Sequence, residues 1–600
     1  MIHEKNTSGG AFVNSFLSGL FPESFFGAAL AQNIRSWALT ALEKKPGIVG
    51  HFLNAPDRLP APGADERPLM PWYNEFAGKL LTGMAFAYQA IPSEELLQAG
   101  SKLASALGAA QGADGYLGVF DEKHRFGGDG ENWDLWGHYH SAYGLLCWYK
   151  VTGGTDSGPL ETARRALDCV YNHFQNRSYD SAGNQTMNLA VSHGFALLYQ
   201  ETGEQRFLDA ALQIVEREWP LSGNWKDHVL EGGEFWQCPL PRWEALHAIL
   251  ALGTLYEITG KEEYFTALEA NWKSIRKTDR HNTGGFSSGE QAQGTPFATG
   301  AIETCCTVAW MALTTEYLRL SKDSAAADEL ELSLYNGMLG ALMPDGRTVA
   351  YNTPMCGDGR MSSQEEIGFQ YNRFSPDFNC CQANALRGLA QISQWAALEG
   401  SDGIFLNFYG GCRMCLKTPG GQKLELVQQT DYPAQGPVAI TLALSSPEEF
   451  TLLLRIPAWS GQTQVSVNGS PLQGITAGAY LPVRRLWHSG DVIRLNLDMS
   501  LHIWKGAEGF SGTASLSYGP LLLVAPRPHE PLNLAEGAKI QPAAMEGNDG
   551  WLQFILAADD GYTVLYDFAT GSHRGAYTSW LSVSYCPCTC NMLQCGTCRF

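Results

Sequence analysis

Residues 196–215 read ALLYQETGEQRFLDAALQIV, and this phrase decides the fold because it recurs along the chain. It joins a helix ending in an aromatic residue, a short break at Thr-Gly, and a second helix. Clear copies are LLCWYKVTGG at residues 145–154 and LGTLYEITGKEEYFTALEANW at residues 252–272, and a weaker copy is centred on Tyr317. The tyrosines of these four copies are 50, 57 and 61 residues apart, which suits one helical hairpin per repeat.

A further hairpin is predicted at residues 75–111, where Pro92 separates two helical runs. In these hairpins the Gly of Thr-Gly is expected to cap a helix, because glycine adopts the left-handed conformation without steric cost. Repeated hairpins either stack as an open solenoid or close on themselves. The uneven repeat lengths and long polar loops favour a closed helical toroid with its loops over a central cleft.

After about residue 400 the apolar pattern changes to a period of two. Short segments rich in β-branched and aromatic residues, such as TLLLRIP at residues 451–457, alternate with Gly, Pro, Asn and Ser, which predicts an antiparallel sandwich. We therefore expect an α+β multidomain protein. Its parts would be a helical domain at 1–400, a β-sandwich at 401–530, and a second small β module with a Cys-rich tail at 531–600.

Composition narrows the class of protein. The 600 residues are 44% hydrophobic and 17% charged, which excludes a single small module and a disordered chain. A net charge of −20 without a basic patch argues against nucleic acid as a partner. With no apolar run long enough for a membrane span and no signal-peptide pattern at the start, we expect a cytoplasmic protein without a membrane partner. The oligomeric state stays open, a homodimer included.

Two adjacent cysteine pairs carry the strongest chemical signal. Glu303 and Cys305-Cys306 precede one helical run, and Cys380-Cys381 precede another. Three thiolates and a carboxylate make a suitable tetrahedral zinc shell, and helix N-termini favour thiolate over thiol. Taken alone, these cysteines are equally compatible with small buried core residues.

Glycosyl chemistry needs a general acid, and Glu290 in the loop GGFSSGE at residues 284–290 is the nearest candidate. Other polar and aromatic side chains have a structural alternative. His247 lies on an apolar helical face, Tyr351 follows a predicted strand, and Glu331 would ordinarily be a surface acid. The aromatics around Trp133 suit either a sugar-stacking platform or a helical core.

The chain resembles glycoside hydrolase family 127, the β-L-arabinofuranosidase family, over about residues 10–530. The matching phrases occur in the family's order: EFAGKLLTGMAFAY, QGADGYLGVF, WDLWGHYHSAYGLL, GGFSSGE, IETCCTVAW, ELSLYNGMLGALMPDGR and CCQANALRGLA. This resemblance implies an (α/α)6 barrel followed by β-sandwich domains.

The resemblance also implies site residues and a cofactor. It implies a Zn2+ site formed by Glu303, Cys305, Cys380 and Cys381, with Cys380 as nucleophile and Glu290 as acid/base. The substrate contacts that it implies, together with neighbouring candidates, are Glu331, Tyr351, His247, Trp133 and His140.

The sequence departs from the family at several sugar contacts. Trp133-Asp134-Leu135-Trp136 stands where well-studied arabinofuranosidases have His-Glu-Leu-Tyr, and Asn188 stands near the position of a further histidine. Gln-Ala replaces Pro-Pro after the second cysteine pair, and the loop from Glu290 to Glu303 is about three residues shorter. The metal and nucleophile residues are therefore kept, whereas the sugar contacts are partly replaced.

These observations predict a retaining glycoside hydrolase that releases a terminal β-L-arabinofuranose-like sugar from plant oligosaccharides. The alternatives are a hydrolase of a branched or acidic pentose from pectin, an inverting enzyme using Glu290 and Glu303 around a structural zinc, and a non-catalytic carbohydrate-binding protein. The expected partner is an oligosaccharide or other glycoside in all four cases.

Overall fold

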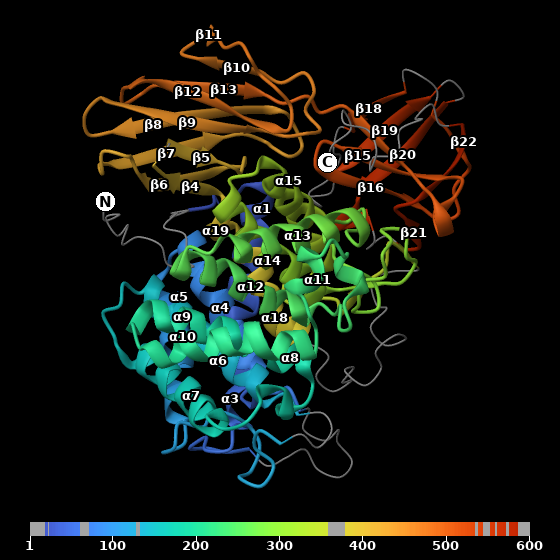
Figure 1. Cartoon of the computed structure of the whole chain (residues 1–600). Coiled ribbons are helices and arrows are strands. Elements are labelled where there is room, and N and C mark those ends of the chain that lie inside the picture. The colour runs from blue at the N-terminus through green and yellow to red at the C-terminus, as the bar shows by residue number, and fades with distance from the viewer. Residues whose placement is uncertain are drawn as a thin grey trace. The chain divides into compact units, whose positions relative to one another are not determined.

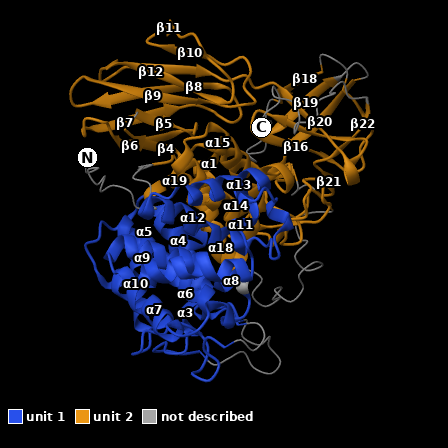
Figure 2. Ribbon diagram, viewed as in Figure 1, with its two compact units in different colours: residues 1–13, 34–88, 92–275 blue, residues 14–33, 89–91, 276–600 orange. Residues whose placement is uncertain are grey.

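The structure is a computed structural model that describes residues 19–21, 23–59, 71–127, 132–357, 379–401, 403–534, 538–543, 552–558, 561–571 and 575–585. Helices dominate up to residue 395 and strands dominate from residue 397 on (Figure 1). The chain forms two compact units (Figure 2), coloured separately there. Unit 1 holds residues 1–13, 34–88 and 92–275, and unit 2 holds residues 14–33, 89–91 and 276–600.

Unit 1 consists of helical hairpins in which a helix buried on all sides is followed by an amphipathic helix. The buried helices are α6 (Asp134–Val151), α9 (Val191–Thr202) and α12 (Glu244–Thr259). Their amphipathic partners are α7 (Gly158–Phe174), α10 (Gln205–Gln213) and α13 (Glu262–Thr278). Because a helix that is apolar all round belongs in a core, this alternation confirms the predicted hairpin repeat.

The first hairpin is formed by α4 (Glu75–Ala90) and α5 (Glu94–Ala109), with Pro92 between them as expected. The predicted glycine caps also occur. Gly203 and Gly260 end α9 and α12 with φ of 69° and 68°, and their N–H groups bond to the carbonyls of Tyr199 and Tyr256.

Unit 2 contains the helices that carry the cysteine pairs. α14 (Thr304–Ser321) is buried as far as Leu318 and packs against α15 (Ser324–Leu332), α18 (Cys380–Ala390) and α19 (Ile392–Trp395). α1 (Phe25–Ser36) lies across the boundary between the units in sequence. The short helices of the chain are α2 (Ala41–Lys44), α3 (Gly47–Gly50), α8 (Gln185–Asn188), α11 (Asp227–Leu230), α16 (Leu339–Ala341) and α20 (Phe568–Gly571).

Two sheets of unit 2 form the predicted sandwich. The four-stranded sheet has the order β12 (Ala479–Trp487), β9 (Glu448–Ile456), β5 (Gly403–Leu406), β4 (Ala397–Gly400). The six-stranded sheet has the order β11 (Ser470–Pro471), β10 (Gln464–Val467), β13 (Val492–Asn496), β8 (Pro437–Leu444), β7 (Lys423–Gln429), β6 (Cys412–Lys417). Alternate residues of β7 and β8 are buried, as the period of two predicts. The pairing is antiparallel except between β5 and β9.

A third sheet forms what we call the C-terminal module, residues 501–585. Its strands are β14 (Leu501–Lys505), β15 (Thr513–Tyr518), β16 (Leu521–Pro526), β17 (Leu532–Asn533), β18 (Lys539–Pro542), β19 (Gln553–Ala558), β20 (Gly561–Asp567), β21 (Tyr577–Thr578) and β22 (Leu581–Tyr585). The sequence analysis put the sandwich boundary at residue 530, whereas β14, β15 and β16 pair within this third sheet. Local strand patterns do not reveal which sheet a strand joins. The Cys-rich tail at 586–600 lies outside the described residues.

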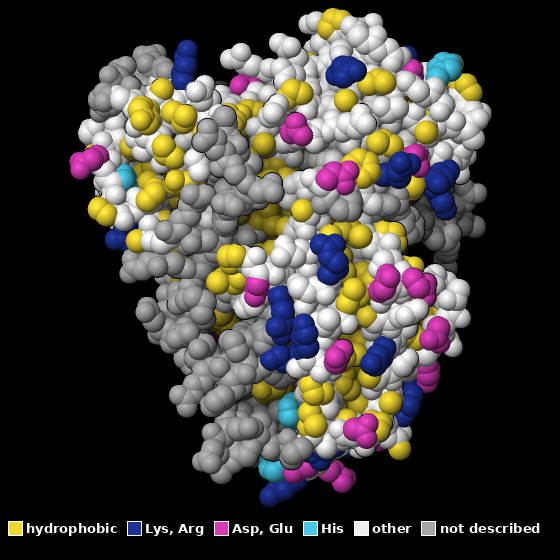
Figure 3. Space-filling view, turned by 180° about the vertical axis from the view of Figure 1, so that it is seen from behind, with side chains coloured by type: hydrophobic (Ala, Val, Ile, Leu, Met, Phe, Trp, Pro, Cys, Tyr) yellow, Lys and Arg dark blue, Asp and Glu magenta, His cyan; other side chains and the backbone are white. Residues whose placement is uncertain are grey.

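Among the described residues on the face shown in Figure 3, basic and acidic side chains are interspersed. Within the described part of the chain, no helix combines the length and apolar character needed to cross a membrane.

Candidate active site

Two helix N-termini in unit 2 carry the candidate metal ligands. α18 begins at Cys380, and its N-cap Asn379 accepts the N–H of Gln382 through its side-chain oxygen at 2.9 Å. α14 begins directly after Glu303 and has Cys305 as its second residue. The two helices pack against each other. Because the N-terminus of a helix favours negative charge, both positions suit thiolates and carboxylates.

A short antiparallel strand pair places Tyr351 beside the cysteines. β1 (Ile302–Glu303) pairs with β2 (Asn352–Thr353), with Glu303 opposite Asn352. The N–H of Thr304 donates to the carbonyl oxygen of Tyr351 at 2.9 Å. As a result, the hydroxyl oxygen of Tyr351 lies 3.8 Å from Sγ of Cys380.

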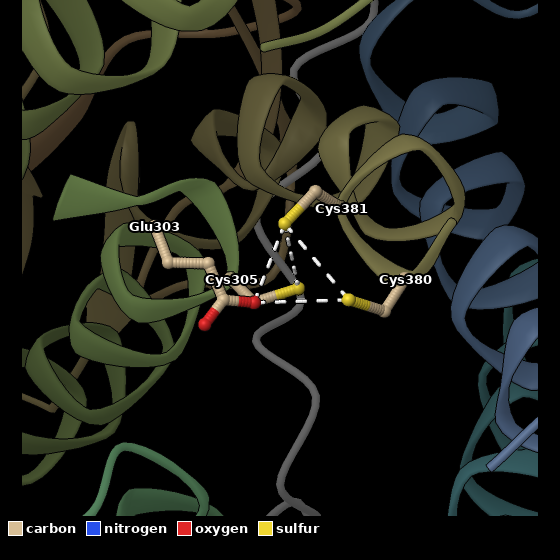
Figure 4. Close-up of side chains that lie close together, drawn as sticks. All are labelled: Glu303, Cys305, Cys380 and Cys381. Atoms are coloured by element: carbon tan, nitrogen blue, oxygen red, sulfur yellow. Dashed lines mark hydrogen bonds between the residues drawn. The ribbon is translucent and has the colours of Figure 1, made fainter. Parts of the chain in front are cut away.

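Glu303, Cys305, Cys380 and Cys381 form one compact cluster, in which the four side chains point toward one another (Figure 4). Sγ of Cys381 lies 3.6 Å from Sγ of Cys305 and 3.4 Å from Oε1 of Glu303. Sγ of Cys380 lies 3.7 Å from the same oxygen and 4.0 Å from Sγ of Cys381. A tetrahedral zinc ion with Zn–S bonds of ~2.3 Å has sulfur–sulfur edges of about 3.8 Å. The four atoms therefore have the spacing of a tetrahedral metal shell.

The surroundings of the cluster favour the neutral form of its thiols in the absence of a cation. Burial raises the pKa of the Cys380 and Cys381 thiols well above their usual range, and the neighbouring Cys305 raises both further. Sγ of Cys305 accepts a hydrogen bond from Nδ2 of Asn384 at 3.5 Å. The four residues that the sequence singled out as metal ligands come together as a group that could hold a metal ion.

Glu290 lies in a tight turn of the loop that precedes the cluster. Ser288 bridges to Gln291, and the two residues between them, Gly289 and Glu290, have φ of 69° and 68°. A two-residue hairpin turn of this kind needs positive φ at both central positions. For a glutamate this conformation costs on the order of 1–3 kcal/mol, as strained residues at functional sites often do. Burial raises the pKa of the Tyr351 phenol strongly, and the charge of Glu290 is among the groups that raise it further.

Glu331 makes its contacts with the sandwich. Its Oε1 accepts from Nη2 of Arg455 and from the hydroxyl of Tyr432, both at 2.6 Å, and its Oε2 lies 3.4 Å from Nε1 of Trp459. Its carboxylate is fully buried, and its hydrogen bonds within the described residues do not involve the cysteine cluster. A role for Glu331 as a substrate contact stays a prediction.

The expected substrate contacts of unit 1 gather around one tryptophan. The ring of Trp136 lies 4.3 Å from that of His140, 5.2 Å from that of His247 and 6.5 Å from that of Trp133. The two histidine rings are 5.1 Å apart. Trp133, Trp136 and His140 lie on one phrase of the sequence and His247 on another, and unit 1 brings them into one aromatic cluster. Their roles toward a sugar stay predictions.

Asn188, which the sequence analysis placed near the position of a further histidine, makes hydrogen bonds that hold the neighbouring backbone. Nδ2 of Asn188 donates to the carbonyl oxygen of Asn132 at 2.7 Å, and Oδ1 accepts the N–H of Trp136 at 3.2 Å. Five residues after Asn188, in α9, His193 has its Nδ1 3.0 Å from the hydroxyl oxygen of Tyr139. His193 was not selected from the sequence, because nothing distinguishes it from a core histidine on an apolar helix.

A buried ion pair next to this cluster was also missed. Nζ of Lys79 lies 2.9 Å from Oε2 of Glu75, and it stands 5.5 Å and 5.2 Å from the ring centroids of Trp136 and Trp243. A signal was present, because Glu75 and Lys79 are the only charged residues of the helical run at 75–90. Their spacing of four residues puts both on one face of the helix.

Two family models match this chain. Residues 22–394 match the family described as β-L-arabinofuranosidase, GH127 catalytic domain, and residues 403–499 match the GH127 middle domain. The chain is 24% identical over 511 residues to a non-reducing end β-L-arabinofuranosidase of Bifidobacterium longum subsp. longum, covering 76% of each protein.

Solved structures of the same family share the fold. A GH127 β-arabinofuranosidase is 20% identical with a TM-score of 0.77, covering 96% of this chain and 98% of that one. A GH127 β-L-arabinofuranosidase from Geobacillus stearothermophilus is 21% identical with a TM-score of 0.75, covering 93% of this chain and 99% of that one. The α+β multidomain architecture expected from the sequence is therefore confirmed. With its catalytic-domain match spanning more than half of the chain, this protein is a glycoside hydrolase and belongs to glycoside hydrolase family 127.

Proposed function

We propose that the protein hydrolyses a terminal β-L-arabinofuranosyl bond with retention of configuration, with Cys380 as nucleophile and Glu290 as acid/base. The observation that carries this proposal is the compact arrangement of Glu303, Cys305, Cys380 and Cys381 beside Tyr351. Two of the relatives described above, a non-reducing end β-L-arabinofuranosidase and a GH127 β-L-arabinofuranosidase, support the substrate class.

Cys380 is the best placed of the three cluster cysteines to act as nucleophile. Its residue is 4% exposed, whereas Cys305 and Cys381 are 0% exposed. It also has the hydroxyl of Tyr351 within 3.8 Å of its sulfur. Only Cys380 therefore combines a position in the cluster with a surface from which a substrate can be reached.

The reaction proceeds in two displacements. Sγ of Cys380 forms a bond to the anomeric carbon while the glycosidic bond breaks, and the carboxyl group of Glu290 gives its proton to the departing oxygen. Glu290 then takes a proton from water, whose oxygen attacks the anomeric carbon and releases the cysteine sulfur. Two inversions at one carbon return the original configuration. Across the cycle one water is consumed and Glu290 regains its proton.

The chemistry of the donor set fits zinc. Three thiolates and one carboxylate at tetrahedral spacing are a zinc shell, because soft sulfur ligands disfavour magnesium and calcium. The residues that would hold Zn2+ are Glu303, Cys305, Cys380 and Cys381. When bound, the ion supplies the positive charge that keeps buried thiols ionised.

The identity of the sugar that is released is a further part of the proposal. An arabinofuranose is favoured by the relatives, and a branched or acidic pentose is the second candidate because Trp133 and Asn188 depart from the residues expected at the sugar contacts. A panel of aryl glycosides that includes a carboxylated pentose distinguishes the two by kcat/KM.

We also propose that the protein is cytoplasmic and acts on short oligosaccharides. This proposal is supported by the absence of a disulfide among the described cysteines.

Two measurements test the mechanism. We expect Cys380→Ser and Cys380→Ala to abolish turnover with the fold intact, and NMR of the first-formed sugar to give the same anomer as the substrate. Activity in either cysteine variant would reject Cys380 as the nucleophile. An inverted first product would instead support direct attack by water with Glu290 and Glu303 as the carboxylate pair.

A further inference from the structure

We propose that the C-terminal module positions the catalytic glutamate, through the four-residue segment Tyr577–Trp580 acting on the loop of Glu290 and on the strand of Tyr351. This inference rests on the proposed function of Glu290. The segment is buried, with residues Tyr577, Thr578, Ser579 and Trp580 between 0% and 6% exposed. All the contacts that carry the inference lie within unit 2.

The first contact is at the beginning of the Glu290 loop. Nδ2 of Asn282 donates to Oγ of Ser579 at 3.0 Å and to Oγ of Ser515 at 2.9 Å. Asn282 is 3% exposed. Without these two hydroxyl acceptors the buried amide would keep only a long contact of 3.5 Å to the carbonyl oxygen of Ser579, and a buried donor left poorly satisfied costs on the order of 1–3 kcal/mol. The base of the loop is thereby fixed to β15 through Ser515 and to the link between β21 and β22 through Ser579.

The second contact is at the other end of the loop. The ring of Phe297 lies 5.6 Å from that of Trp580 and 5.7 Å from that of Trp504. Beside it, the hydroxyl of Thr295 donates to Glu508 at 2.7 Å. Three aromatic rings from two parts of the chain thus form one buried contact that holds the end of the loop.

The loop passes this fixed position on to Glu290 through its own hydrogen bonds. Oδ1 of Asp279 accepts the N–H groups of Gln293 and Gly294 at 2.5 and 3.0 Å. Nε2 of Gln293 in turn donates to the carbonyl oxygen of Ser288, which begins the turn of Glu290, at 2.6 Å. A shift of the loop ends would therefore move the turn rather than be absorbed by a loose segment.

The same segment of the module also holds the other side of the site. The N–H of Ser579 donates to the carbonyl oxygen of Met355 at 2.9 Å, and Thr578 pairs with Cys356 where β21 meets β3 (Cys356–Gly357). Met355 lies four residues after Tyr351, which contacts the sulfur of Cys380. Ser579 thus bonds through its side chain to the acid/base loop and through its backbone to the strand beside the nucleophile.

The expected consequence concerns proton delivery. A catalytic acid must stand within hydrogen-bond distance of the departing oxygen, and a displacement of about 1 Å can lower the rate by about 100-fold. A leaving group that is already a good one needs no proton. Misplacing Glu290 should therefore slow the cleavage of methoxyphenyl glycosides far more than that of dinitrophenyl glycosides, whereas a general loss of folded protein slows both equally.

The test compares these two substrates in variants of the full-length, metal-replete protein. We expect Asn282→Ala, Phe297→Leu and Trp580→Leu to lower the ratio of kcat/KM for methoxyphenyl over dinitrophenyl arabinofuranoside by about 10- to 100-fold. Because Phe297 and Trp580 act through one contact, the double variant should lose little more than either single variant.

A matched control uses Phe554→Leu, since Phe554 is a fully buried ring of the same module that packs on Tyr518. We expect it to leave the ratio unchanged, even where it lowers the melting temperature as much as Phe297→Leu does. An unchanged ratio in all three anchor variants, or an equal fall in Phe554→Leu, would overturn the proposal. If a leucine variant does not fold, Ser579→Ala, which removes a single oxygen, replaces it, and the same fall in the ratio is expected.

Glu290→Gln separates this proposal from the one on which it rests. If Glu290 is the acid, that variant lowers the ratio by at least as much as any anchor variant, and azide restores turnover of the dinitrophenyl substrate. If Glu290→Gln leaves the ratio unchanged, the assignment of Glu290 fails. If it lowers the ratio while the anchor variants do not, only the positioning role fails.

Discussion

Adjacent cysteines in this chain have different surroundings at the scale of single residues. Cys305 lies 3.6 Å from the sulfur of Cys381, whereas Cys306, the next residue, has its sulfur 3.9 Å from Oε2 of Glu303 and stands outside the four-member cluster. Successive residues of a helix point about 100° apart, so only one of two neighbours can face a given point. The sequence alone shows two equivalent cysteines, and the helix geometry makes them inequivalent.

This difference supports a prediction with a built-in control. We expect Cys305→Ser to weaken metal binding by about 100-fold or more and to abolish activity, because a hydroxyl is a poor ligand for zinc. Cys306→Ser should keep both metal and activity. Metal content of the purified variants, measured by mass spectrometry, checks this. Equal metal content in the two variants would argue against Cys305 as a ligand.

Tyr351 gives a second prediction at this scale. Its hydroxyl lies 3.8 Å from the sulfur of Cys380, and hydrogen bonds to a charged group contribute about 1.5–3 kcal/mol. We therefore expect Tyr351→Phe to lower kcat/KM by about 10- to 100-fold without loss of metal. Tyr335→Phe is the control, because Tyr335 is equally buried and its hydroxyl faces the carbonyl oxygen of Tyr409. A full-rate Tyr351→Phe enzyme would exclude this contact from the mechanism.

At the scale of elements, α15 and β9 are joined by a buried group of charges. The guanidinium of Arg455 on β9 forms ion pairs with both Asp328 and Glu331 on α15. One buried cation thus pairs with two buried carboxylates. Buried ion pairs of this kind hold elements in register more than they stabilise them, and the loss of one partner is costly.

The excess of negative charge predicts a pH effect on stability. Burial raises the pKa of Asp328 to about 6 in spite of Arg455, with Glu331 adding to the rise, against an ordinary value of 3.8. Because the folded-state pKa is raised, the folded protein holds this proton where the unfolded chain has lost it. The contribution to stability is therefore full below pH 3.8 and is lost as pH rises through about 6.

The variant Asp328→Asn keeps the size of the side chain and removes its titration. We expect the free energy of unfolding of the variant, relative to the natural protein, to rise by about 2 kcal/mol between pH 4 and pH 7. Calorimetric melting of both proteins across this range checks the prediction. A constant difference would mean that Asp328 is ionised in the folded protein throughout.

At the scale of the whole molecule, the sequence predicted what repeats or lies close together in the chain. The helical hairpins, the change to strands and the cysteine cluster all follow from periodicity or from short motifs that carry their own chemistry. Ser579, which bonds to Asn282, lies 297 residues away from it in the chain. Arg455, which bonds to Glu331, lies 124 residues away. No local sequence pattern links either pair. The sequence did not assign β14 to the C-terminal module for the same reason, because sheet membership depends on which strands pair, and a strand's own residues do not show this.

The candidate metal ligands lie on two helices that are distant in the chain, so a bound ion would join α14 to α18, and this predicts how the whole molecule responds to chelation. A ligand that binds only the folded state stabilises it by about 4 kcal/mol when present at ~1,000 times its dissociation constant. We therefore expect a strong zinc chelator to lower the melting temperature by several degrees and to abolish activity, and Zn2+ to restore both. Cys306→Ser should respond in the same way, since its metal shell is intact. In Cys305→Ser the melting temperature should already be low and insensitive to chelation, because unfolding no longer releases an ion. If the natural protein melted at the same temperature with and without chelator while losing its activity, the ion would serve the chemistry without joining α14 to α18.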